Sequence, residues 1–259
     1  MGGFLFHDTV FGPVMSRRLG VSLGINLLPV DYKYCTFNCI YCECGWTHKK
    51  PAGSKGLPDR KTVKKLLEAK LISIKKEGSA PDAITFAGNG EPTIHPDFAA
   101  IIDDTIALRN TYFPNARITV LSNASMLHRN DVFNALLQLD NNIQKLDAGN
   151  ERMFQLINKP AGKLSLEKVV EQLTRFKGKL IIQTIFLKGE HNGTFIDNTK
   201  EEEVESWLKI LKQLAPAYVM IYPVDRETPE QNIEKISFEA LNKIAEKVKQ
   251  IGIKTKVFG

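Results

Sequence analysis

The sequence predicts an α/β fold in which a parallel sheet is built from repeated strand–helix units. Short apolar runs of strand type alternate with longer amphipathic segments of helical periodicity along most of the chain. Parallel neighbours in a sheet need a crossover connection, which is usually a helix. No linker, repeat or change of composition divides the 259 residues, so we expect one domain over residues 1–259.

The expected strands are short apolar runs bounded by turn residues or polar side chains. In the first of them, Gly20 and Gly24 allow close approach of the backbone. Residues 179–187 form the most apolar run, with Gln183 and Thr184 as its polar breaks. The expected strands are Val21–Leu28, Ala83–Ala87, Arg117–Leu121, Ile143–Asp147, Lys179–Leu187, Tyr218–Tyr222 and Lys254–Phe258.

The expected helices have apolar residues on one face and recognisable end signals. In the first, Val63 and Ile74 share the apolar face, and Gly78 suits the position just past the helix end. A further helix runs between Ser165, a good N-cap, and Gly178. The first of these helices spans Thr62–Glu77. The others are expected at Pro96–Thr111, Leu127–Leu139, Glu201–Leu214 and Phe238–Ile251.

The composition is that of an ordinary globular protein, with 43% hydrophobic residues, 25% charged residues and a net charge of +6. The positive charge suits an anionic partner and equally a basic solvated surface. We find no apolar run long enough for a membrane span, and the start MGGFLFHDTV has no basic region of a signal peptide. The cysteines are clustered rather than spaced for disulfides, so we expect a cytoplasmic protein.

The segment Asp31–Gly45 contains Cys35, Cys39 and Cys42 in a C-x3-C-x2-C run. Three thiolates this close together can bind one inorganic centre. A structural zinc site needs four ligands, usually in two separated pairs, and only Cys44 remains in the chain. A cluster of iron and sulfur bound by three cysteines fits better, because it keeps one iron open for a small ligand. A zinc site or a redox thiol cluster is the alternative.

This run, with the aromatic Tyr41 directly before Cys42, resembles the signature of the radical S-adenosylmethionine (radical SAM) superfamily. The resemblance implies a partial (β/α)6 barrel of the TIM type, a [4Fe–4S] cluster held by the three cysteines, and S-adenosylmethionine as second cofactor. In that family the cofactor chelates the open iron, and reductive cleavage yields a 5′-deoxyadenosyl radical that abstracts hydrogen from the substrate. The resemblance places Tyr41 beside the adenine.

The second expected strand runs into Gly88-Asn89-Gly90-Glu91-Pro92. Glycines at a strand end let a ligand approach backbone carbonyl groups. The segment is similar to the Gly-Gly-Glu-Pro motif of the superfamily, which receives the methionine amino group. Gly88, Asn89, Gly90 and Glu91 are therefore candidate cofactor-binding residues, although Asn89 departs from the motif.

Polar residues also follow the third and fourth expected strands, where a parallel barrel gathers its active site. Relatives often carry Thr-Asn-Gly where this chain has Ser122 and Asn123, and this resemblance implies contacts to the cofactor's ribose or carboxylate. A turn that caps the next helix is the alternative. Lys145 and Asp147 lie two residues apart and so share a face of their strand, which we expect to be the inner one. We expect Asp147 to bind cofactor or substrate, and Lys145 to contact an anionic or carbonyl group of the substrate.

Three further positions are open to two interpretations. Gln183 hydrogen-bonds either a ligand inside the barrel or a neighbouring backbone group, and Tyr222 either flanks adenine or is a core tyrosine. The adjacent Arg17 and Arg18 either hold a carboxylate or phosphate or form a surface pair. The loop Lys188–Lys200 is a candidate cover for the substrate.

The stretch GPVMSRRLG, followed by SLGIN, is similar to the branch of radical SAM proteins related to wyosine-pathway enzymes, which build a tricyclic base on tRNA. The resemblance implies an enzyme of oxidoreductase or lyase type with a single cluster, no flavodoxin domain and tRNA as candidate substrate. A peptide, protein or small-molecule substrate is the alternative, as for glycyl-radical activating enzymes. A zinc protein that binds RNA without catalysis is an alternative of another class. The enzyme needs a low-potential electron donor, flavodoxin or ferredoxin, and we expect a monomer.

Overall fold

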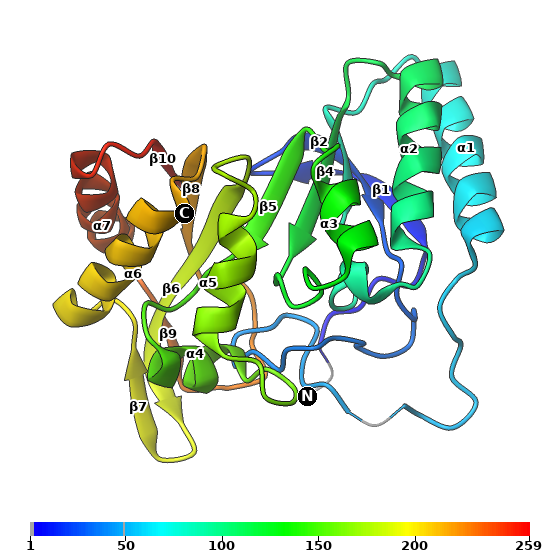
Figure 1. Ribbon diagram of the computed structural model, residues 1–259. Coiled ribbons are helices and arrows are strands. Elements are labelled where there is room, and N and C mark those ends of the chain that lie inside the picture. The colour runs from blue at the N-terminus through cyan, green and yellow to red at the C-terminus, as the bar shows by residue number, and fades with distance from the viewer. Residues whose placement is uncertain (1–2, 49) are drawn as a thin grey trace.

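The computed structural model describes residues 3–48 and 50–259, and its strands form one open sheet (Figure 1). Residues 1–2, at the start of the chain, and residue 49 lie outside the described residues. Residue 49 falls in Glu43–Arg60, which its glycine, proline and lysine content predicts to be a loop. The strands are β1 Val10–Ser16, β2 Gly20–Ile25, β3 Ala83–Phe86, β4 Arg117–Ser122, β5 Asn141–Lys145, β6 Ile181–His191, β7 Thr194–Asp197, β8 Tyr218–Pro223, β9 Ile233–Lys235 and β10 Thr255–Val257.

The strand order β1-β2-β3-β4-β5-β6-β8-β10 follows the chain, with β7 and β9 both paired to the long strand β6. From β2 to β10 the neighbours on this path run parallel, whereas β1 is antiparallel to β2. The sheet is not closed, since β1 stands at one end of the order and β10 at the other. The expected partial barrel with a parallel sheet is therefore confirmed.

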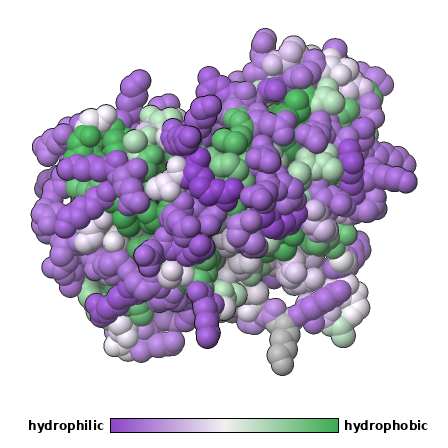
Figure 2. Space-filling view, in the orientation of Figure 1, coloured by the Kyte–Doolittle hydropathy of each residue, from purple (hydrophilic) through white to green (hydrophobic). Residues whose placement is uncertain are grey.

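Helices cover the outer face of the curved sheet, from α1 and α2 on one side to α7 on the other (Figure 1). Their bounds are α1 Arg60–Lys76, α2 Phe98–Tyr112, α3 Asn130–Leu136, α4 Glu151–Asn158, α5 Leu166–Thr174, α6 Glu201–Leu214 and α7 Phe238–Gln250, with a short 3-10 helix at Pro92–Ile94. Figure 2 shows mostly polar side chains on this helical face, because the apolar residues of the helices are turned toward the sheet.

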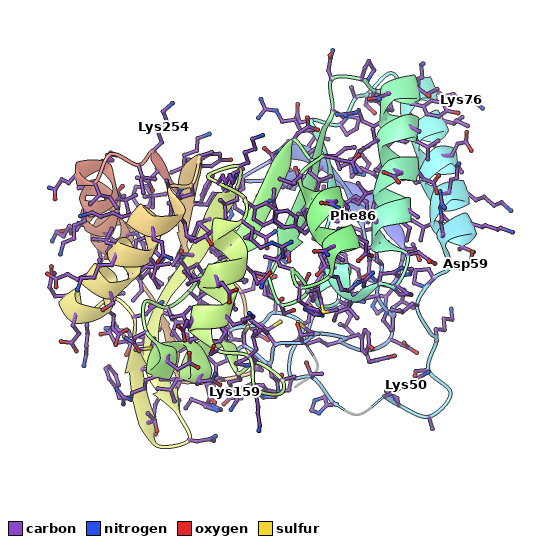
Figure 3. The ribbon with its side chains drawn as sticks, viewed as in Figure 1. Lys50, Asp59, Lys76, Phe86, Lys159 and Lys254 are labelled. Carbon is purple, nitrogen blue, oxygen red and sulfur yellow. The ribbon has the colours of Figure 1, made fainter. Side chains whose placement is uncertain are left out.

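The main core lies between the sheet and the helices. Phe86 of β3 is fully buried and meets Phe98 of α2 edge to face, with ring centroids 6.1 Å apart, whereas Lys76 and Lys254 project outward (Figure 3). A second, smaller cluster of Ile143, Ile181 and Met220 lies on the inner face of the sheet, and Leu19 of the β1–β2 turn and Phe258 both pack against it. The inner face is thus apolar at one end and leaves the other end for the polar residues described below.

The structure differs from the sequence-based expectation in four elements. Strand β1 was missed because Gly12-Pro13 interrupts its pattern and proline is rare inside strands. The expected loop Lys188–Lys200 is instead the end of β6 with β7, joined by Asn192-Gly193 with both residues at positive φ, which is a typical hairpin turn. Strand β9 and helix α4 were also missed, both being short.

Several expected helices begin or end at other residues, and α2 and α3 show why. Helix α2 starts at Phe98 instead of Pro96, since the chain before it forms the 3-10 turn. Helix α3 spans only Asn130–Leu136, inside the expected Leu127–Leu139, because the residues on both sides form turns. In residues 3–48 and 50–259, none of the helices is long and apolar enough to cross a membrane.

Candidate active site

The three cysteines lie in a segment that is held between two parts of the barrel; we call residues 31–45 the cysteine segment. Tyr34 forms a parallel bridge to Gly90 in the loop after β3. On the other side, the Ile40 N–H donates to the carbonyl oxygen of Ile157 in α4 at 3.0 Å. The segment therefore crosses the carboxyl ends of the strands with its backbone fixed at both sides.

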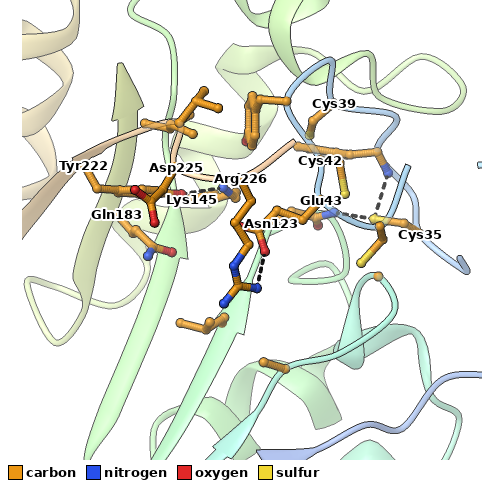
Figure 4. A pocket seen from close by; sticks show the side chains of 18 of the residues that line it. Cys35, Cys39, Cys42, Glu43, Asn123, Lys145, Gln183, Tyr222, Asp225 and Arg226 are labelled. Carbon is orange, nitrogen blue, oxygen red and sulfur yellow. Dashed lines mark hydrogen bonds and ion pairs between the residues drawn. The ribbon is translucent and has the colours of Figure 1, made fainter. Parts of the chain in front are cut away.

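Cys35, Cys39 and Cys42 line one side of a cavity of about 270 Å³ (Figure 4). Among the residues that the structure describes, no three His, Cys, Asp or Glu side chains form a group able to hold a single metal ion. A cubane cluster does not need such a point of convergence, because its cysteine ligands are distributed around it. Three thiols around one cavity are therefore a donor set that suits a cluster better than a zinc ion.

Burial dominates the titration of two of the thiols. It raises the pKa of Cys35, to which the charges of Cys39 and Glu91 add. It also raises the pKa of Cys39, and the nearby Lys145 ammonium works in the opposite direction. A cluster binds cysteine as thiolate, so positive charge near these sulfurs favours its binding.

Cys42 differs because the thiol of Cys44 lies beside it, although that thiol donates its hydrogen bond to the Gly88 carbonyl oxygen at 3.6 Å. The neighbouring Cys44 thiol lowers the pKa of Cys42 against the effect of burial, with a further contribution from Lys33, while the pKa of Cys44 is raised. Lys33 is buried and its ammonium donates to the Gly45 carbonyl oxygen at 2.9 Å. The sequence interpretation missed Lys33, although a lysine so close before Cys35 was the available signal.

The loop after β3 brings backbone groups to the same cavity. Gly88, Gly90 and Glu91 line it. A Cβ atom on Gly90 would lie 2.0 Å from the Tyr34 carbonyl oxygen, and the residue has φ of +139°, so only glycine fits there. Asn89 has a different role, because its buried amide donates to the carbonyl oxygens of Phe6 and Pro29 at 2.9 and 2.8 Å.

Glu91 links this loop to the end of β4. Its carboxylate accepts hydrogen bonds from the Asn123 N–H at 2.6 Å and from the Thr93 N–H at 3.1 Å. Burial still raises the pKa of Glu91, partly offset by these donors. Ser122 and Asn123 line the cavity, and Ser122 also accepts from the Ala124 N–H at 3.1 Å. Contact of this pair with the cofactor stays a prediction. The alternative is wrong in one respect: both side chains form local turns, but neither caps the next helix, because α3 begins only at Asn130.

On the opposite side of the cavity, Lys145 lies between two tyrosines. Its ammonium donates to the Tyr222 hydroxyl at 2.9 Å and lies 4.6 Å from the ring centroid of Tyr41. Burial works against the charged form of Lys145, but Asp147, Tyr222 and Cys39 outweigh it and raise the pKa of the lysine. Lys145 is therefore an ammonium that faces the cavity.

Asp147 does not line the cavity in the described part of the chain. Its fully buried carboxylate accepts from the Tyr41 hydroxyl, from the Asn158 amide at 2.8 Å and from the Ile185 N–H at 3.0 Å, and lies 3.9 Å from the Lys145 ammonium. These contacts leave it little capacity for a ligand. The geometry makes Asp147 a residue that orients Tyr41 and Lys145 from behind.

Gln183 stands opposite Lys145 in the register of β5 and β6. It is 3% exposed, it lines the cavity, and its amide nitrogen has no hydrogen-bond partner. A buried amide without a partner is costly unless a ligand supplies one. Of the two interpretations of Gln183, contact with a ligand is the one that this geometry favours.

Three arginines, which the sequence did not assign to the cavity, also line it. Arg226 pairs with Glu43 at 2.8 Å, and Arg17 pairs with Asp225 at 2.8 Å. Arg18 lies 5.0 Å from the Tyr222 ring centroid. Figure 4 shows Arg226 reaching across between Asp225 and Asn123.

The structure thus brings together most of the residues that the sequence singled out, with Asn89 and Asp147 just outside the lining. The lining contains Cys35, Cys39, Cys42, Tyr41, Gly88, Gly90, Glu91, Ser122, Asn123, Lys145, Gln183 and Tyr222.

Residues 30–197 match the radical SAM superfamily. The chain belongs to this superfamily of enzymes, whose cofactors are a [4Fe–4S] cluster and S-adenosylmethionine. Within it, the chain is related to proteins of the UPF0026 group. It is 32% identical to UPF0026 protein MJ1312 of Methanocaldococcus jannaschii over 95% of this chain and 73% of that protein.

A second relative is a longer protein. The chain is 31% identical, over 90% of its length, to a protein named GTPase Obg from Brachyspira hyodysenteriae, and spans only 32% of that protein. The G-x4-G-K-[ST] loop typical of many GTPases is absent from the sequence of our chain. The similarity thus covers about a third of that protein.

Solved structures share the fold at low sequence identity. A radical SAM methyltransferase from Sphaerobacter thermophilus has a TM-score of 0.68 at 14% identity, with 92% of this chain and 65% of that chain covered. Streptococcus suis SuiB bound to S-adenosylmethionine has a TM-score of 0.64 at 14% identity, over 91% and 50%. Archaeal TYW1 has a TM-score of 0.54 at 13% identity, over 88% and 71%.

Proposed function

We propose that Cys35, Cys39 and Cys42 are the ligands of the [4Fe–4S] cluster. The observation that carries this assignment is that all three thiols line one cavity at the carboxyl ends of a parallel sheet. When bound, the reduced cluster supplies the electron that cleaves S-adenosylmethionine. The chain's own contribution is to hold the thiols in place and to surround them with the charges of Lys33 and Lys145.

We further propose that S-adenosylmethionine lies along the same cavity. Gly88 and Gly90 expose backbone to its amino group, and Glu91 fixes the loop that does so. Ser122 and Asn123 are the candidates for its polar groups. The remaining candidate contacts are Tyr41 and Tyr222, with Asn89 acting through the loop backbone. Gln183 lines the same cavity and is a candidate contact either for the cofactor or for the substrate.

Lys145 is the residue that we assign to the substrate. It presents an ammonium to the cavity that is already partnered on one side by Asp147 and Tyr222. We assign Asp147 to positioning of Lys145 and Tyr41, in place of the direct contact that the sequence suggested. The whole chain acts as one domain, as a monomer, in the cytoplasm, with a low-potential flavodoxin or ferredoxin as electron donor.

The proposed substrate is a base in tRNA. What supports it is the resemblance of the GPVMSRRLG stretch to wyosine-pathway enzymes, together with the net charge of +6 and three arginines at the cavity. The test compares the modified nucleosides in tRNA from cells with and without this protein. We expect one modified nucleoside to be missing or replaced by its precursor, and identical profiles would contradict a tRNA substrate.

The cluster assignment has a sharper test, because the chain offers a control cysteine. We expect no iron–sulfur absorbance after anaerobic reconstitution in any of the variants Cys35→Ala, Cys39→Ala and Cys42→Ala. These variants should also fail to release 5′-deoxyadenosine from S-adenosylmethionine when dithionite is the reductant. Cys44→Ala should keep the cluster, since Cys44 is not one of the three proposed ligands and its thiol donates to the Gly88 carbonyl oxygen. The assignment would be refuted if the Cys44 variant lost the cluster while at least one of the other three variants kept it.

A further inference from the structure

Arg18 is a cation at the cavity with no anionic partner. Its backbone N–H donates to the Ser16 hydroxyl at 3.3 Å, and its guanidinium lies 5.0 Å from the Tyr222 ring centroid. Among residues 3–48 and 50–259, no carboxylate pairs with this guanidinium. Arg17 and Arg226 differ, because Asp225 and Glu43 respectively neutralise them.

Lys145 lies beside the same tyrosine ring, 5.6 Å from its centroid. An ammonium has three N–H donors, and one of them is used by the Tyr222 hydroxyl. The carboxylate of Asp147 is 3.9 Å away and already accepts from Tyr41 and Asn158. Lys145 therefore has donors left for a ligand.

Gln183 provides an independent sign of a ligand at this place. Its amide is buried, lies opposite Lys145 in the sheet register and has a nitrogen without a partner. Two cations and one unpartnered amide thus meet on the wall of one cavity. Donors of this kind, and guanidinium above all, match the oxygens of a carboxylate or a phosphate.

We propose that Arg18, Lys145 and Gln183 form an oxyanion subsite that binds a carboxylate or phosphate group of the substrate. The proposal rests on the proposed function, since it presupposes that the cofactor occupies the cysteine side of the cavity. Figure 4 shows Gln183 and Tyr222 across the cavity from Cys35, with Lys145 beside them. An anion at this wall lies away from the glycine loop that we assign to the cofactor's amino group.

The subsite is tested by calorimetric titration of the full chain, loaded with cluster and saturated with S-adenosylmethionine, with sodium phosphate and with sodium acetate. We expect saturable binding of one or both probes. Arg18→Gln should weaken it about tenfold or more, because charge-assisted hydrogen bonds are lost. Arg18→Lys should retain part of the affinity, since it keeps the charge without the planar fork. The probe that binds more tightly identifies phosphate or carboxylate as the group recognised.

The matched control is Arg152→Gln, which removes an exposed guanidinium on α4 and should bind both probes like the wild type. Three results would overturn the proposal: neither probe binds the wild type, Arg18→Gln binds as well as the wild type, or both probes compete with S-adenosylmethionine. The last result would make the subsite part of the cofactor's own site. Calorimetry reports binding at the subsite, whereas the absorbance of the protein reports whether the cluster is present. Failure of the subsite and failure of the cluster assignment are therefore distinguished.

Discussion

Asp147 shows how much of this site depends on a carboxylate that no ligand needs to touch. It is the shared acceptor of Tyr41, Asn158 and the backbone N–H of Ile185, and it lies beside Lys145. A buried charge is tolerated only with such a set of partners. Removing its charge leaves the ammonium of Lys145 without the carboxylate that lies 3.9 Å from it.

Asp147→Asn keeps the shape of the side chain and removes the charge. We expect the free energy of unfolding to fall by about 3 kcal/mol, because one partner of a buried pair is lost and the new amide meets groups that donate. Urea unfolding of the chain without cofactors measures this. Asp103→Asn, on the exposed face of α2, should change stability by less than about 0.5 kcal/mol. Equal stability of the two variants would show that Asp147 is not a structural acceptor.

At the scale of elements, the loop after β3 and the cysteine segment form one unit. The Tyr34 N–H donates to the Asn89 carbonyl oxygen at 2.8 Å, and the Glu91 N–H returns a bond to the Tyr34 carbonyl oxygen at 3.2 Å. Gly90 lies between these bonds with no room for a Cβ atom. The position of Cys35 therefore depends on a glycine that is distant in the sequence.

Gly90→Ala should displace the cysteine segment, because the new methyl group meets the Tyr34 carbonyl oxygen and the residue keeps a positive φ. We expect a loss of about 2 kcal/mol or more in unfolding free energy, and a clear drop in reconstituted cluster. Gly53→Ala is the matched control, because Gly53 also has a positive φ, of +74°, but nothing lies within 4 Å of a Cβ atom there. This variant therefore measures the cost of the backbone conformation without any steric contact. Full cluster content in Gly90→Ala would contradict the coupling.

The helix pair α1 and α2 has its own electrostatic contact. Asp104 of α2 accepts from Arg60 at 2.6 Å and from Lys64 at 3.1 Å, both in α1, and these bonds lower the pKa of its carboxyl group. A carboxyl group whose pKa is lower in the folded state than in the unfolded state stabilises the fold at pH values above the unfolded pKa. The contribution is lost as the pH falls through the folded pKa.

Asp104→Asn should therefore lower the unfolding free energy by about 1 kcal/mol at pH 7, a modest effect because both partners are half exposed. The difference from the wild type should shrink below about pH 4, where the unfolded chain also binds the proton. Denaturant unfolding across the pH range measures it. A difference that stays constant down to pH 2, about two units below the ordinary pKa, would show that the ion pair is not its cause.

For the whole molecule, local patterns were enough to predict the order of the parallel strands and the place of the site, but not which residues are paired. The alternation of apolar runs gave the sheet order, and the two-residue period put Lys145 on the inner face. No local pattern separates Arg17 from Arg18. Their difference depends on Asp225, which the fold brings to Arg17 from the far end of the chain.

The same arginine bridges the open side of the barrel. Arg17 follows β1, at one edge of the sheet, and its guanidinium contacts both Asp225 and the carbonyl oxygen of Gly259, just past β10 at the other edge. Strand β10 is three residues long and pairs only with β8 in the described sheet. An edge strand this short has little stability of its own, so a contact across the gap is expected to hold it.

Arg17→Gln should leave the global stability within about 1 kcal/mol of the wild type, because the ion pair is exposed. Its effect should be local: the amides of Thr255–Val257 should exchange with solvent several times faster, while those of β3 and β4 keep their rates. Hydrogen exchange read by mass spectrometry distinguishes the two regions, and Arg152→Gln serves again as the exposed control. If β10 exchanges at the wild-type rate in Arg17→Gln, the two edges of the sheet are held by packing alone, of the kind that Leu19 and Phe258 each make against the small apolar cluster on the inner face.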